Sequence, residues 1–206
     1  ATDDLSNYSA LYDQYRGFAS DQLGGEDGVY GIPTRFDWTG YAYDSSLLPD
    51  HDAGWTNVFG GIPGTYPQDD IAMLDSPVQA VAAAGFNRGY ADAFTGDSFS
   101  LSESELSDAQ DALATQKRKY LYEYISGRET FVSGMNTNEF LVSQTTRSDY
   151  VALRRSGNDD ARMKTPPEGA LTTYDTALVT EDASDTEAAL SVIDAFVSAE
   201  AGAELA

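Results

Sequence analysis

The sequence contains no cysteine among its 206 residues. Disulfides, thiolate metal sites and cysteine nucleophiles are therefore excluded. Histidine occurs once, as His51 in a loop rich in proline and aspartate, which excludes a zinc site built from several histidines. We expect His51 to be a solvent-exposed loop residue. Neither a Gly-x-Gly-x-x-Gly nor a Gly-x-Ser-x-Gly turn is present, and we expect neither a metal nor a cofactor.

Basic residues are also scarce: 12 Lys and Arg stand against 34 Asp and Glu, for a formal charge of −22. The acids are spread along the whole chain, which indicates an acidic folded surface rather than a disordered acidic tail. Such a surface repels nucleic acid, so we expect no nucleic-acid partner. It is typical of a halophilic protein, because concentrated salt screens the self-repulsion. Attraction of cationic ligands is the alternative explanation.

Long apolar stretches are missing as well. No run approaches the roughly 18 residues of a membrane span, and no signal-peptide pattern is visible, which is compatible with a leader already removed. The chain is nevertheless 41% hydrophobic. Its length and apolar content predict a real core, in one large domain or two small lobes.

Residues 71–85 have the clearest pattern in the chain. Ile71–Leu74 is apolar and has the length of a buried strand. Ser76 is a good N-cap, Pro77 suits the first helical position, Gln79 completes a capping box, and Gly85 can end the helix in a left-handed turn. Such a strand–turn–helix unit places free N–H groups at the carboxyl end of a sheet, where small ligands bind. The alternative is an ordinary connection within a core.

Further strand and helix patterns alternate along the chain. We expect two strand segments within 29–44, broken near Gly40, and helices that begin at Ser102, with Glu105 completing a capping box, and at Asp185. Additional strands are predicted over 120–125, 140–142, 161–165 and 171–179, with a helix between the second and third of these. This alternation predicts an α/β fold with a mainly parallel sheet flanked by helices.

Several short motifs follow one another in an order that resembles a known family. They are Ile32-Pro33, Thr39-Gly40-Tyr41-Ala42-Tyr43-Asp44, Trp55, the Asp75-Ser76 turn, Pro167-Glu168-Gly169-Ala170, Tyr174-Asp175-Thr176-Ala177-Leu178 and the last helix. The order is similar to that of the extracellular solute-binding proteins of ABC importers, of the spermidine/putrescine-binding type, over about residues 29–206. The resemblance implies a periplasmic-binding-protein-like fold of two α/β lobes that close on a ligand.

The resemblance also implies a division of the chain. Residues 1–35 would form the end of the first-lobe segment and a crossing strand, residues 36–169 the second lobe, and residues 170–206 the return to the first lobe. The family has additional first-lobe sequence before the crossing strand and further helices at the end. We therefore expect a fragment, with a complete second lobe and an incomplete first lobe.

The function implied by the resemblance is capture without catalysis. The protein would bind a small polar or cationic organic solute, polyamine-like, outside the cell at its surface, and would work as a monomer with an ABC permease in the membrane. Phe36 matches a pocket aromatic and Asp175 the amine-binding aspartate, whereas Ser76 and Gln79 stand where the family has acidic side chains. The full set of candidate ligand-binding residues is Phe36, Asp37, Trp38, Thr39, Ser76, Gln79, Ser143, Gln144, Thr173 and Asp175.

Two other functions stay open from the sequence. An acidic α/β hydrolase could use carboxylates such as Asp37 and Asp175. A surface sensor or adhesive domain would need no small ligand and no transport role.

Overall fold

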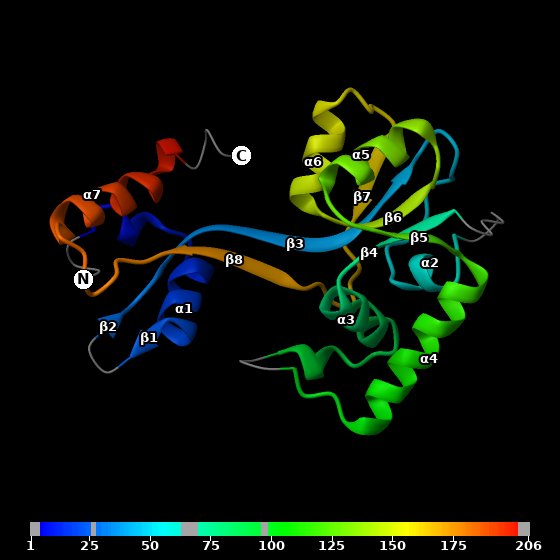
Figure 1. The fold of residues 1–206 in the computed structure, drawn as a ribbon, viewed down its shortest axis with the longest axis horizontal. Helices are drawn as coiled ribbons and strands as arrows, with labels where there is room; N and C mark the ends of the chain where they lie inside the picture. The colour runs from blue at the N-terminus through cyan, green and yellow to red at the C-terminus, as the bar shows by residue number, and fades with distance from the viewer. Residues whose placement is uncertain (1–4, 26–27, 63–69, 96–98, 202–206) are drawn as a thin grey trace. The chain divides into compact units, whose positions relative to one another are not determined.

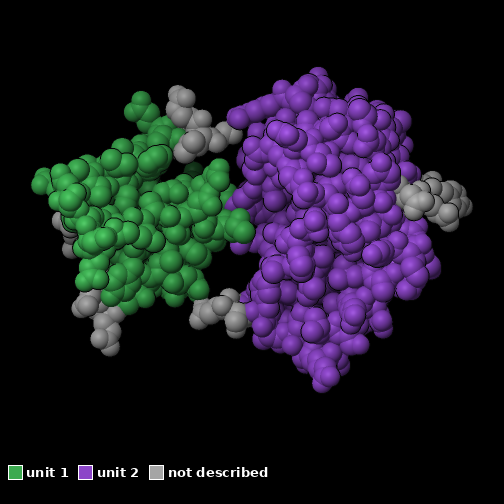
Figure 2. Space-filling model, viewed as in Figure 1, with its two compact units in different colours: residues 1–36, 173–206 green, residues 37–172 purple. Residues whose placement is uncertain are grey.

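The structure, a computed structural model, describes residues 5–25, 28–62, 70–95 and 99–201. It divides the chain into two compact units, shown in different colours in Figure 2. Unit 1 consists of Ala1–Phe36 and Thr173–Ala206, and unit 2 of Asp37–Thr172. Each unit has a core of its own and is described separately.

Unit 2 is built on a mixed sheet with the strand order β5-β4-β6-β3-β7. The strands are β3 (Ile32–Asp44), which begins in unit 1, β4 (Ile71–Leu74), β5 (Leu121–Ile125), β6 (Val142–Thr146) and β7 (Ala161–Lys164). β4 runs parallel to β5 and β6, whereas β3 runs antiparallel to β6 and β7. β4, β5, β6 and β7 therefore all end at one edge of the sheet, and β3 enters from that edge.

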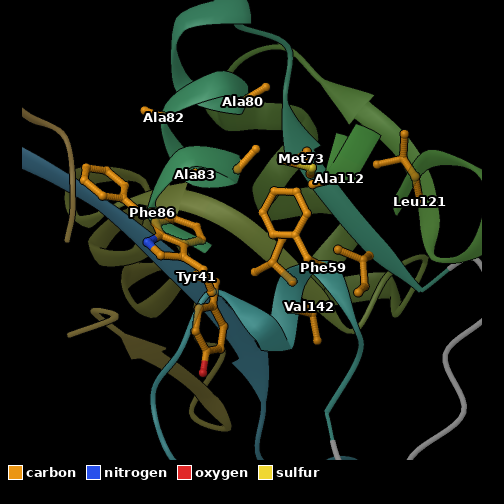
Figure 3. Packing of buried hydrophobic residues seen from close by; sticks show 14 of the residues in the cluster. Tyr41, Phe59, Met73, Ala80, Ala82, Ala83, Phe86, Ala112, Leu121 and Val142 are labelled. Carbon is orange, nitrogen blue, oxygen red and sulfur yellow. The ribbon is translucent and has the colours of Figure 1, made fainter. Parts of the chain in front are cut away.

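Helices cover both faces of this sheet, as Figure 1 shows. One face packs against α2 (Thr56–Phe59), α3 (Pro77–Asn87) and α4 (Glu103–Lys119), and the other against α5 (Arg128–Thr137) and α6 (Arg147–Arg155). The larger core lies on the first face and includes Tyr41, Phe59 and Met73 (Figure 3). The smaller core lies on the second face around Phe131 and Leu153. The predicted α/β fold with flanking helices is confirmed.

The predicted strand–turn–helix unit is confirmed in outline. β4 occupies Ile71–Leu74, and α3 begins at Pro77 after its N-cap Ser76. The capping box is only half formed: Ser76 Oγ accepts from the Gln79 N–H at 3.5 Å, but the Ser76 N–H donates to the Leu74 carbonyl at 2.8 Å. The box predicted at the start of α4 is complete.

The predictions that Gly85 ends a helix and that Gly40 breaks a strand are wrong. Both glycines occur where another part of the chain comes too close to leave room for a Cβ atom. Gly85 does not end α3, which continues to Asn87; a Cβ at Gly85 would lie 2.4 Å from the Phe94 ring. Gly40 does not break β3, which is continuous. A Cβ there would lie 2.4 Å from the carbonyl oxygen of Lys164 on the neighbouring strand β7.

Unit 1 is smaller and combines both ends of the described chain. Its elements are a 3₁₀ turn (Tyr8–Ala10), α1 (Asp13–Gln22), the short strands β1 (Gly24–Gly25) and β2 (Gly28–Val29), the first part of β3, β8 (Thr172–Ala177) paired with β3, and α7 (Thr186–Phe196). A small core contains Leu5, Ile32, Ile193 and Val197. The Asp194 carboxylate joins the two chain segments, since it accepts from the Asn7 N–H at 2.8 Å.

Unit 1 leaves several large apolar side chains exposed. Leu178, Val192 and Phe196 are each more than half exposed. Among the helices of the described ranges, in either unit, none combines the length and the apolar character that crossing a membrane requires.

Candidate functional site

Polar side chains collect where the strands of unit 2 end. The strands β4, β5 and β6 lead directly into α3, α5 and α6, so the three helix N-termini, each carrying partial positive charge, lie along this edge. β3 passes the same edge, because Thr39 is opposite Thr146 at the end of β6. We call this region the carboxyl-edge site. Its residues are Asp37, Trp38, Asp75, Ser76, Gln79, Arg128, Thr146, Arg147, Ser148, Asp149 and Thr165.

Gln144 braces the β4–α3 turn from inside the protein. Its side chain is fully buried; Oε1 accepts from the Leu74 N–H at 3.3 Å, and Nε2 donates to the Gln79 carbonyl at 3.1 Å. Ser143 is equally buried, and its hydroxyl donates to the Gln144 carbonyl at 3.0 Å. These two predicted ligand residues therefore support the site rather than line it, whereas Ser76 and Gln79 are partly exposed.

Asp37 is engaged in holding the start of α6. Its carboxylate accepts from the Trp38 N–H at 2.9 Å and from the Ser148 N–H at 3.2 Å. Thr146 caps the same helix by accepting from the Asp149 N–H at 3.2 Å. The negative charge of Asp37 thus lies at a positive helix end, where it is stabilising. Thr39, another predicted ligand residue, is buried, and its N–H donates to the Leu171 carbonyl at 3.0 Å.

Trp38 and Arg147 form an aromatic–cation pair at the carboxyl-edge site. The guanidinium carbon of Arg147 lies 5.4 Å from the ring centroid of Trp38, within the range of a cation–π interaction. The indole Nε1 donates to Thr165 Oγ1 at 3.0 Å, which fixes the ring. Sequence reasoning identified Trp38 but missed Arg147. The available signal was an arginine at the first helical position, directly after the N-cap Thr146.

The predicted site residues in unit 1 are Phe36, Thr173 and Asp175. Phe36 belongs to an aromatic cluster with Tyr15 and Tyr174, at ring-centroid distances of 5.3 and 6.0 Å. Burial, with the nearby Tyr174 as a smaller cause, raises the pKa of Tyr15 above its ordinary value. Thr173 is exposed.

Asp175 already has a cationic partner. Its carboxylate accepts from Arg35 Nε at 2.7 Å, and the two groups form an ion pair with both side chains more than half exposed. An amine that binds Asp175 must therefore compete with Arg35. Asp37 and Asp175, the carboxylates suggested for a hydrolase, belong to different units, and each is hydrogen-bonded to another group.

His51 is not a solvent-exposed loop residue, contrary to the prediction. It is partly buried against Tyr43, at a ring-centroid distance of 4.6 Å, and its Nε2 lies 3.0 Å from the Tyr41 hydroxyl. Asn57 also donates to that hydroxyl, at 2.8 Å. Burial raises the pKa of Tyr41 to about 12. The loop folds back on the sheet because these polar groups satisfy one another. Across the described residues, no three His, Asp or Glu side chains are grouped so that they could hold a metal ion.

Comparison of the sequence with protein-family models gives no match, and comparison with curated proteins gives none either. The structure, in contrast, is similar to solved structures of substrate-binding proteins. One is the spermidine/putrescine ABC transporter substrate-binding protein PotD of Streptococcus pneumoniae, with a TM-score of 0.78 and 13% identity, covering 96% of this chain and 55% of that one. Another is the PotD lipoprotein of Treponema pallidum, with a TM-score of 0.74 and 15% identity, covering 96% and 58%.

A third neighbour was solved with a sugar phosphate bound. It is the periplasmic binding protein AfuA of Actinobacillus pleuropneumoniae with bound fructose-6-phosphate, with a TM-score of 0.60 and 16% identity, covering 95% of this chain and 56% of that one. These likenesses show that the chain has the fold of ABC substrate-binding proteins, as its sequence motifs predicted. The chain spans a little over half the length of the solved structures that it matches.

Proposed function

We propose that this chain is part of the solute-binding component of an ABC importer, and that it captures a small polar organic solute. The observation that carries the proposal is the carboxyl-edge site on a substrate-binding-protein fold, where three helix N-termini and a partly exposed aromatic–cation pair lie together. Sites of this kind bind small molecules at the carboxyl ends of strands. The protein would act outside the cell, at its surface, as a monomer that delivers solute to a membrane permease.

We further propose that residues 36–169 form a second lobe, which corresponds closely to unit 2 (Asp37–Thr172). Residues 1–35 and 170–206, which correspond closely to unit 1, would be part of a first lobe. The lengths of the solved neighbours support this, because nearly half of each has no counterpart in the present chain. The small core and exposed apolar residues of unit 1 also fit a lobe that is larger in the neighbours.

Mass spectrometry of small molecules released from protein purified without dialysis tests this proposal. A solute retained in a fixed ratio to protein, which the protein also binds in calorimetric titration without chemical change, is the expected result. Turnover of the released compound would instead favour the hydrolase. Absence of any retained or titratable solute would favour a sensor or adhesive domain.

A polyamine-like cation is the finer form of the proposal, and two of the solved neighbours, from Streptococcus pneumoniae and Listeria monocytogenes, carry spermidine/putrescine in their names. In this chain it has a specific test, since Asp175 is the carboxylate expected to meet an amine. Asp175→Asn should weaken a cationic solute by about tenfold or more, the range for a hydrogen bond to a charged group. Asp182→Asn, at another exposed aspartate of unit 1, is the matched control and should change nothing.

A further inference from the structure

We infer that the solute carries an anionic group, a carboxylate or a phosphate, and that Arg147, held on the face of Trp38, binds this group. The inference rests on the proposed function and specifies the chemistry of the same carboxyl-edge site. Three observations support it: the position of Arg147 at the start of α6, the absence of an ion pair to it among the described residues, and its contact with the Trp38 ring.

The placement of Arg147 is unfavourable for stability. Arg147 is the first residue of α6, and cations are disfavoured at the positive end of a helix. Arg128 occupies the equivalent first position of α5 but is neutralised by Asp149, with Arg128 Nε 2.7 Å from Asp149 Oδ1. Arg147 makes no ion pair with any residue that the structure describes, in a chain with a formal charge of −22. A cation at a positive helix end, with no ion-pair partner, breaks a local electrostatic rule, and such exceptions are expected at functional positions.

The nearby acids make no ion pair with Arg147 among the described residues. Asp37 accepts from the Ser148 N–H, and Asp149 pairs with Arg128, so each carboxylate is engaged elsewhere. Asp75, at the end of β4, is exposed to solvent. Arg147, a partly exposed residue, is therefore a cation of this edge that has no ion-pair partner among the described residues.

The support of Arg147 suits recognition of an oxyanion. The guanidinium lies over the indole of Trp38, and Thr165 holds the indole by accepting from its Nε1. A guanidinium that stacks on an aromatic face keeps its planar set of N–H donors directed outward, and these donors match the two oxygens of a carboxylate or phosphate. The positive ends of α3, α5 and α6 add to the attraction.

The test is calorimetric titration of the 206-residue protein with inorganic phosphate, succinate and spermidine at one fixed ionic strength. The variants are Arg147→Gln, which removes the charge, and Arg147→Lys, which keeps the charge but loses the planar donors. Arg155→Gln is the matched control, because it makes the same change at the exposed C-terminal end of the same helix. Thermal unfolding of each variant checks the fold.

We expect phosphate or succinate to bind the wild type and to lose about tenfold or more in affinity in Arg147→Gln, with an intermediate loss in Arg147→Lys and none in Arg155→Gln. Which of the two anions binds distinguishes phosphate from carboxylate chemistry. Binding should also change the fluorescence of Trp38, and Trp38→Phe should remove that change.

Two results would overturn the inference while the proposed function stands. One is binding of spermidine with no binding of either anion; the other is an equal loss of anion affinity in Arg147→Gln and Arg155→Gln. Failure of all three probes, together with no solute retained on purification, would overturn the inference and the proposed function together.

Discussion

Unit 1 and unit 2 differ in how much of their apolar surface they bury. Unit 2 has two cores, one on each face of its sheet, with fully buried large side chains such as Trp55, Tyr41 and Phe131. Unit 1 has a single small core around Ile193 and exposes Phe196 from the same helix. Burial of apolar surface is the main stabilising term in folding, so most of the stability of this chain resides in unit 2. Unit 2 also carries the carboxyl-edge site.

The largest expected effect compares one substitution in the two units. Phe131→Ala in unit 2 should destabilise the protein by about 3–5 kcal/mol, because it empties a buried site. Phe196→Ala in unit 1 should stay within about 0.5 kcal/mol, because that ring is 53% exposed. Urea unfolding followed by circular dichroism gives both values. Similar losses in the two variants would show that the units are equally well packed.

The buried brace at the β4–α3 turn provides the second test. Gln144→Leu should lower the free energy of unfolding by about 1–3 kcal/mol, because the Leu74 N–H loses its acceptor inside the protein. Gln14→Leu, at an exposed position of α1 in unit 1, is the control and should have little effect. Hydrogen exchange should increase at Leu74 in the first variant alone. An unprotected Leu74 amide in the wild type would contradict the brace.

Helix caps should be worth the same in both units, because a cap acts on its own helix and not on the size of the core. Ser102→Ala on α4 and Asp185→Ala on α7 should each cost about 1 kcal/mol. Ser76→Ala should cost less, since its bond to the Gln79 N–H is long, at 3.5 Å. The free energies of unfolding of the three variants, each compared with that of the wild type, test these values. A much larger loss for Asp185→Ala would show that α7 holds unit 1 together.

Salt should stabilise unit 1 more than unit 2. The only basic residues of unit 1 are Arg16 and Arg35, so its many carboxylates repel one another with little compensation. Raising KCl from about 0.1 M to about 3 M should raise the melting temperature, because salt screens this repulsion. Hydrogen exchange, measured separately for the amides of each unit, shows which unit gains more stability from the salt. An unchanged or lower melting temperature would contradict the halophilic interpretation.

The smallest expected effect is the loss, at low pH, of the stability that Asp194 contributes to unit 1. The Ser6 hydroxyl, followed by the Asn7 N–H, lowers the pKa of Asp194 below its ordinary value. The stability that Asp194 adds is therefore present above the pKa of an unfolded aspartate, about 3.9, and is lost as the pH falls through the folded value. Asp194→Asn should be less stable than the wild type at pH 7 and equal to it in strong acid. Urea unfolding at both pH values, with Asp182→Asn as control, measures the difference.

The sequence predicted the elements that depend on local signals. Ser76, Pro77 and Ser102 mark helix starts through their own side-chain and backbone chemistry, and the structure begins α3 and α4 there. Gly40 and Gly85 were interpreted as local breaks, but each is required by a neighbour distant in sequence, Lys164 and Phe94 respectively. Spacing along the chain carries no information about such approaches.

The candidate site was likewise predictable only where local sequence signals mark it. The turn after β4 and the aromatic Trp38 could be found from patterns, but the partners of the predicted side chains could not. Asp37 and Gln144 are engaged by Ser148 and Leu74, which come from other parts of the chain. Arg147 was missed because its significance depends on the ring that lies beneath it.

The Gln144 brace separates the shape of the β4–α3 turn from its surface chemistry. Gln144 holds main-chain atoms of Leu74 and Gln79 and no side-chain atom of either. The side chains at positions 76 and 79 can therefore be exchanged while the backbone path of the turn is kept. This makes the turn a suitable scaffold for engineering: a small library at these two positions would alter which solutes are selected without redesign of the fold.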